Sequence, residues 1–124
     1  MKWLGIAFAL LGLTLISVER FGAEKKLTGN EIKSTRSGYT LGFKAWSGST
    51  GEISYKSDGT MEGKKDSGHS DVGKWWVKDD KYCRQWDNWR SGDWHCFHIY
   101  ETGDKEYKDV RTDGGHTNIL WMIK

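Results

Sequence analysis

Apolar and polar residues alternate with a period of two along most of the chain after residue 38. This alternation predicts strands that bury one face, and the glycine-containing and acidic segments between them predict short turns. Asp58-Gly59 is a strong hairpin signal, and Asp79-Asp80 fits a two-residue hairpin loop. Eight strands are expected, over residues 39–46, 52–56, 60–65, 72–78, 81–86, 94–100, 105–111 and 117–124.

One helix is expected ahead of the strands, over residues 27–37. Thr28 and Glu31 have the spacing of a capping box, Ile32 follows on the buried side, and Gly38 ends the helix. Eight strands with short connections are enough to close a meander, and closure removes the edges that favour aggregation. The sequence therefore predicts an all-β, mainly antiparallel fold: an up-and-down barrel with the helix at one end. A two-sheet β-sandwich is the alternative.

The segment over residues 74–100 contains both cysteines and five of the eight tryptophans. If Cys83 lies opposite Cys96 on adjacent strands, Arg84 lies opposite His95, and the alternation of side chains separates two faces. One face is mostly aromatic and aliphatic, so we expect it to face the core. Its members are Trp75, Val77, Tyr82, Arg84, Trp86, His95, Phe97 and Ile99.

Residues 1–23 have the pattern of an export signal peptide. Lys2 gives a short basic start, and residues 3–16 are uncharged and mostly apolar but too few for a comfortable membrane span. We expect cleavage near Ala23, with an uncleaved membrane anchor as the alternative. Residues 24–124 would then form a single β-barrel domain, periplasmic or secreted, with no membrane span after cleavage.

The two cysteines of an exported chain are expected to form a disulfide, here Cys83–Cys96. A metal site formed by both cysteines and His98 is the alternative, because all three share a face in this register. No metal or cofactor is expected in the favoured interpretation. The formal net charge of +2 is spread over short mixed blocks, so the sequence does not predict nucleic-acid binding.

Three short motifs stand out along the chain: Leu-Thr-Gly-Asn-Glu-Ile at residues 27–32, Gly-x-Trp-x-Val at Gly73, Trp75 and Val77, and Cys83-x-x-Trp86 followed by Cys96. Together they resemble a family of small exported bacterial proteins of unassigned function, over most of residues 27–124. The chain is also loosely similar to lipocalin-like barrels. The resemblance implies export, a disulfide and a β-rich fold, and it implies no particular activity.

No catalytic motif is present, whether a G-x-S-x-G elbow, an H-E-x-x-H pair or a phosphate-binding glycine loop, so an enzyme is not expected. A buried guanidinium such as that of Arg84 needs a partner. One hypothesis is that Arg84 and His95 anchor an anionic ligand inside the barrel, with the ligand's apolar body resting on Trp75 and Trp86. An internal carboxylate is the alternative; the acids considered for that role are Glu52 and Asp109.

The expected loop over residues 87–93 suggests a second class of function. Trp89 and Arg90 lie at its centre, and tryptophan and arginine are enriched at interface hot spots. The chain would then be an interaction or inhibitor protein that presents this loop to a macromolecule, such as an envelope protein or a hydrolase. Alternatively, Trp89 folds back over the mouth of the barrel as a lid.

Overall fold

The computed structural model describes residues 24–124, and the expected signal peptide lies outside these residues. The described part of the chain is mostly strand. Its elements are β1 (Lys25–Lys26), α2 (Gly29–Arg36), β2 (Thr40–Lys44), β3 (Thr50–Tyr55), β4 (Thr60–Lys65), β5 (Ser70–Lys78), β6 (Lys81–Trp86), the short 3-10 helix η1 (Trp89–Gly92), β7 (Trp94–Gly103), β8 (Glu106–Arg111) and β9 (Thr117–Met122).

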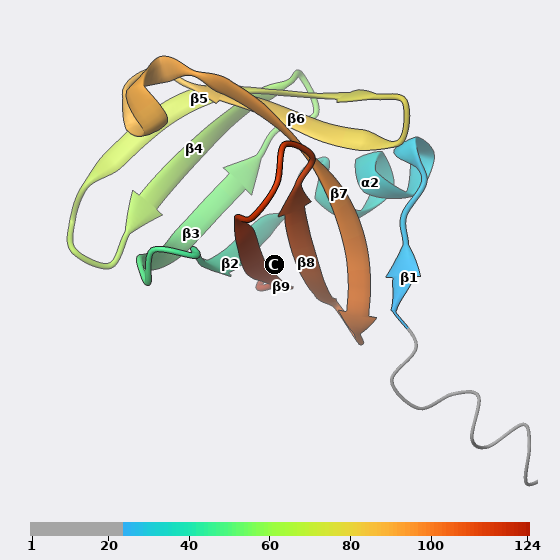
Figure 1. Ribbon diagram of the computed structural model, residues 1–124. Helices are drawn as coiled ribbons and strands as arrows, with labels where there is room; N and C mark the ends of the chain where they lie inside the picture. Colours follow the sequence, from blue (N-terminus) through green and yellow to red (C-terminus); the bar gives the residue numbers. More distant parts are fainter. Residues whose placement is uncertain (1–23) are drawn as a thin grey trace, which may run out of the picture.

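The strands form a closed up-and-down barrel. Each strand from β2 to β8 pairs antiparallel with the next strand, and β9 pairs with β2 to close the ring of eight. Figure 1 shows the resulting curved sheet, with β1 lying beside β7 as an additional strand. The predicted barrel is therefore confirmed, and the alternative of a two-sheet sandwich is wrong.

The predicted register of the central strands is also confirmed. Cys83 is paired with Cys96 and Arg84 with His95, and Asp79-Asp80 forms the turn between β5 and β6 with positive φ at both residues. The two cysteines form a disulfide. Because this bond consumes both thiolates, the alternative metal site with His98 is wrong.

Differences from the sequence prediction occur at the ends of elements. The helix spans residues 29–36, with the capping box of Thr28 and Glu31 in place. β1 was not predicted, because two residues are too few to show an alternation. β7 continues to Gly103 through an irregularity after Glu101, where a turn was expected.

The helix closes one end of the barrel. Ile32 and Arg36 are both fully buried, and α2 packs against β5 and β6. The backbone N–H of Gly29 donates to the carboxylate of Asp80 at the β5–β6 turn, and that of Gly38 donates to the carbonyl of Tyr55. These bonds fix the helix across this end, and among residues 24–124 the open end of the barrel is the opposite one. Within residues 24–124 we find no helix with the length and apolar character required to span a membrane.

Candidate ligand-binding cavity

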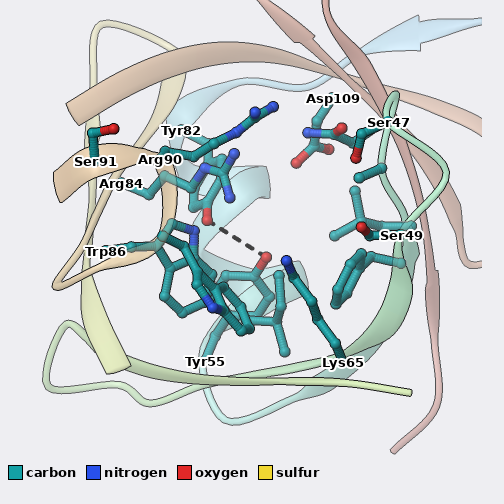
Figure 2. A pocket seen from close by; sticks show the side chains of 16 residues that line it. Ser47, Ser49, Tyr55, Lys65, Tyr82, Arg84, Trp86, Arg90, Ser91 and Asp109 are labelled. Atoms are coloured by element: carbon teal, nitrogen blue, oxygen red, sulfur yellow. Dashed lines mark hydrogen bonds between the residues drawn. The ribbon is translucent and has the colours of Figure 1, made fainter. Parts of the chain in front are cut away.

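The interior of the barrel contains a cavity of about 330 Å³ at the end opposite the helix. Its lining comes from β2, β3, β4, β6, β8 and β9 together with loop residues at the mouth (Figure 2). The mouth residues include Ser47 and Ser49 of the β2–β3 loop and Arg90 and Ser91 of the β6–β7 loop. The cavity therefore extends from the middle of the barrel to its open end.

Aromatic and aliphatic side chains form much of the cavity wall. Phe43, Ile53 and Leu120 line it, as do the indoles of Trp86 and Trp89, whose ring centroids are 4.6 Å apart. A Cβ atom added at Gly63 would lie 2.5 Å from the ring of Trp89 and 2.7 Å from that of Trp86. Glycine at this inward position of β4 is therefore what allows both indoles to enter the barrel.

Two tyrosine hydroxyls meet at the inner end of the cavity. The hydroxyl of Tyr82 donates to that of Tyr55 at 3.5 Å, and the bond is drawn as a dashed line in Figure 2. Burial raises the pKa of the Tyr55 hydroxyl, and it raises the pKa of Tyr82 well above its ordinary value. Both side chains therefore stay protonated and can donate hydrogen bonds at neutral pH.

Below the tyrosines, Arg36 and Asp109 form a buried ion pair. The two guanidinium nitrogens donate to the two carboxylate oxygens at 2.8 Å and 2.6 Å, and the guanidinium also lies over the rings of Tyr55 and Tyr82. Burial lowers the pKa of Arg36, but Asp109 and the two tyrosines together raise it by more, so the arginine stays charged. Asp109 does point inward, as one alternative proposed, but its partner is Arg36 and not Arg84.

Three further cations line the cavity without forming an ion pair with any residue in the described range 24–124. They are Lys65, Arg84 and Arg90. Each lies on an aromatic face: Arg84 4.9 Å from the ring centroid of Phe97, Lys65 4.9 Å from that of Trp89, and Arg90 5.4 Å from that of Trp46. Such contacts offset part of the cost of desolvation but do not neutralise the charge.

The charges at the mouth repel one another. Burial lowers the pKa of Arg90, and the positive charges of Arg84 and Arg111 lower it further. Arg111 itself is bonded through two nitrogens to Asp113, so it is already neutralised. The net result is a cavity that is cationic at and near its mouth.

His95 and Trp75 lie outside the cavity lining, although both were proposed to contact a ligand. Trp75 is buried, packs edge-on against Tyr55, and donates its indole N–H to the carbonyl of Lys56. His95 is half-buried opposite Arg84, with Nδ1 4.0 Å from a carboxylate oxygen of Asp113. Of the four proposed ligand contacts, only Arg84 and Trp86 line the cavity.

Trp89 and Arg90 both turn toward the barrel interior and line the cavity. Their loop is held by the buried carboxylate of Asp71, which accepts hydrogen bonds from the backbone N–H groups of Asn88 and Trp89 and from the Asn88 side-chain amide. The position of Trp89 matches the alternative in which it covers the mouth of the barrel. Trp89 therefore does not project outward as a partner-binding anchor in this structure.

Sequence reasoning missed the contributions of Lys65, Asp71 and Arg36. Met61, Gly63 and Lys65 alternate along β4 and share its inward face, so the alternation of this strand could have predicted the position of Lys65. Arg36 lies four residues after Ile32 and thus on the same face of the helix. Asp71 lies two residues before Gly73 and therefore on the same inward face of β5. It falls ahead of the strand predicted from the sequence, in a polar loop.

Comparison of the chain with protein-family models, with curated proteins and with solved structures finds no match at the significance applied. The geometry of the cavity is therefore the basis for assigning a function. In the part of the chain that the structure describes, no cluster of three or more His, Cys, Asp or Glu side chains is arranged to hold a metal ion.

Proposed function

We propose that this chain is an exported binding protein that holds a small anionic molecule inside its barrel. The observation that carries the proposal is the set of three cavity cations, Lys65, Arg84 and Arg90, none of which has a carboxylate partner within the described residues 24–124. Placing three partly buried charges around a cavity costs free energy unless each is paired, and a bound anion recovers part of that cost. Arginine is suited to this role because its planar guanidinium meets a carboxylate or phosphate with two parallel bonds.

The architecture supports the same function. Eight-stranded up-and-down barrels such as lipocalins have room for one small ligand. Here the interior combines an apolar wall with cations and hydroxyl donors, a composition typical of small-molecule sites. The disulfide is typical of proteins in an oxidising compartment, which supports a periplasmic or secreted location.

A tryptophan-fluorescence screen of carboxylates, fatty acids and phosphate esters tests the proposal, because Trp86 and Trp89 both line the cavity. The Arg84→Met variant should bind the best ligand at least about tenfold more weakly, as expected for loss of a charge-assisted hydrogen bond. Lys74→Met is the matched control, since it changes the net charge equally at an exposed position of β5. Equal binding by wild type and Arg84→Met, or no binding between pH 5 and 8, would reject the proposal.

The second class of function, an interaction or inhibitor protein that uses loop 87–93, has less support. Its two anchor residues, Trp89 and Arg90, line the cavity and are only half exposed. Native mass spectrometry of the protein purified from its own host separates the two classes. A retained small molecule supports the binding protein, whereas a retained protein that dissociates on mutation of exposed loop residues supports the interaction protein.

A further inference from the structure

The cavity carries more positive charge than a single carboxylate can neutralise. Arg36 and Asp109 neutralise each other through two short bonds, so they contribute no net charge to the site. Lys65, Arg84 and Arg90 remain, and they come from β4, β6 and the β6–β7 loop respectively. A monocarboxylate would leave two of these charges facing each other across a confined space.

The three cations are arranged around one region of the cavity. Figure 2 shows the side chains of Arg84 and Arg90 extending from one wall of the cavity and that of Lys65 extending from the opposite side. The electrostatic effect of Arg84 on Arg90 indicates that the two guanidiniums lie within repulsive range. An anion bound between these groups would contact cations on two sides.

The remaining polar groups around this region are mostly hydrogen-bond donors. Ser47, Ser49 and Ser91 place hydroxyls at the mouth, and within residues 24–124 none of these hydroxyls is bonded to another side chain. Tyr55 accepts the bond from Tyr82, which leaves its own proton available to a ligand. An oxyanion with several oxygens uses such donors well, and the apolar wall of Phe43, Ile53 and Leu120 favours an organic body attached to it.

We infer that the ligand is a small organic dianion, a phosphate monoester or a dicarboxylate, whose charged end lies among Lys65, Arg84 and Arg90 and whose apolar body contacts Phe43, Ile53 and Leu120. This inference rests on the proposed function, because it specifies the charge of the molecule that the cavity holds. Two negative charges match the three cations better than one does. The dianion therefore gains affinity without any additional contact area.

The test uses two probes of nearly the same shape and different charge. Phenyl phosphate is a dianion at pH 7.5, well above a second phosphate pKa of about 6, whereas phenyl sulfate is a monoanion. Calorimetric titration of the wild-type protein should give a dissociation constant about fivefold lower for phenyl phosphate, the upper end of what one additional partly exposed ion pair supplies. Phthalate compared with benzoate forms the second arm and distinguishes a dicarboxylate ligand from a phosphate ester.

Matched variants identify the cations responsible. Lys65 and Lys64 are neighbours on β4 that point to opposite faces of the sheet. Lys65→Met should reduce the preference for phenyl phosphate over phenyl sulfate by about threefold, and Lys64→Met should leave it unchanged. Circular dichroism checks that both variants are folded. The affinity ratio of the two probes for the wild-type protein tests the inference even if a variant fails to fold.

The outcomes separate this inference from the proposed function. If the mono- and dianionic probes bind with equal affinity, or the monoanions bind more tightly, the dianion inference is overturned and the anion-binding function stands. If none of the four probes binds, both are rejected. A preference for dianions that persists in Lys65→Met and is lost in Lys64→Met would also overturn the inference, because the charge would then act from the outer face.

Discussion

The carboxylate of Asp71 accepts a hydrogen bond from the backbone N–H of Trp89 at 2.8 Å, across 18 positions of sequence. The same carboxylate binds the backbone and side chain of Asn88. A single buried acid of β5 thus fixes the loop that carries both Trp89 and Arg90 over the cavity. The mouth of the barrel is organised from within the sheet and not by the loop alone.

Asp71→Ala should therefore release the loop. Loss of the acceptor leaves two backbone N–H groups without a partner, at a cost of about 1–3 kcal/mol. We expect faster hydrogen exchange over residues 87–93 and a change in tryptophan fluorescence. Asp87→Ala is the control, because this exposed acid lies in the same loop and its side chain forms no hydrogen bond or ion pair with the residues that the structure describes. Equal exchange in both variants would contradict the role of Asp71.

The same bond makes the loop sensitive to acid. Burial raises the pKa of Asp71, but the N–H groups of Trp89 and Asn88 lower it by more, so its net shift is downward. A depressed carboxyl pKa stabilises the folded state above the ordinary pKa of about 4, and this contribution is lost as the pH falls through the lowered value. Hydrogen exchange measured between pH 5 and pH 2.5 should show the loop opening within this interval. The Asp71→Ala variant provides the reference. Its loop should already exchange fast, and its exchange should not depend on pH once intrinsic rates are corrected for.

Arg36→Met should destabilise the protein by about 3–5 kcal/mol, because Asp109 would be left as a buried charge without a partner. The double variant Arg36→Met/Asp109→Leu should recover much of this loss, since it removes both charges together. Urea unfolding of the two single variants and the double variant measures the coupling. If the losses in unfolding free energy of the two single variants add up to that of the double variant, the two side chains stabilise the fold independently. That result would contradict the ion pair.

Gly63→Ala should destabilise the barrel by about 1–3 kcal/mol through overpacking against Trp86 and Trp89. Truncation of the nearer ring in Gly63→Ala/Trp89→Ala should relieve part of that strain. The effect of Gly63→Ala should thus be smaller in the Trp89→Ala background than in the wild type. A loss of the same size in both backgrounds would mean that the indole of Trp89 leaves this position in solution.

Removal of the disulfide in Cys83→Ser/Cys96→Ser should cost about 3 kcal/mol by the loop-entropy model. The wild-type protein, denatured without a reductant, should show no reactive thiol. Labelling of both cysteines under these conditions would contradict the disulfide.

His95 should report on ligand binding although it lies outside the cavity lining. Burial lowers its pKa, and the positive charges of Arg111 and Arg84 lower it further. An anion bound near Arg84 cancels part of this repulsion, so the pKa of His95 should rise on binding, and by linkage the ligand should bind more tightly once His95 is protonated. NMR titration of the histidine resonances measures the shift. His98, whose pKa is lowered by burial and by Lys26 and Lys81, is the internal control and should not respond.

The strands and their register were predictable because they depend on local alternation. Once Cys83 was placed opposite Cys96, the pairing of Arg84 with His95 followed from the period of two. The contacts of Arg36 and Asp71 were not predictable in this way. Arg36 meets a residue 73 positions away, and Asp71 acts on the backbone of a loop whose path no periodicity specifies.

The side from which the chain enters the barrel also has a consequence for access to the cavity. Lys25 of β1 pairs with Glu101, far along β7 from Trp94 at the mouth, and Glu24 forms an ion pair with Lys108. Figure 1 shows β1 lying beside β7 and leading up to the helix that closes the barrel. A sensor surface that holds the protein by this side of the barrel would leave the mouth directed toward free solution. Immobilisation through this side of the barrel is therefore the orientation of choice for binding measurements.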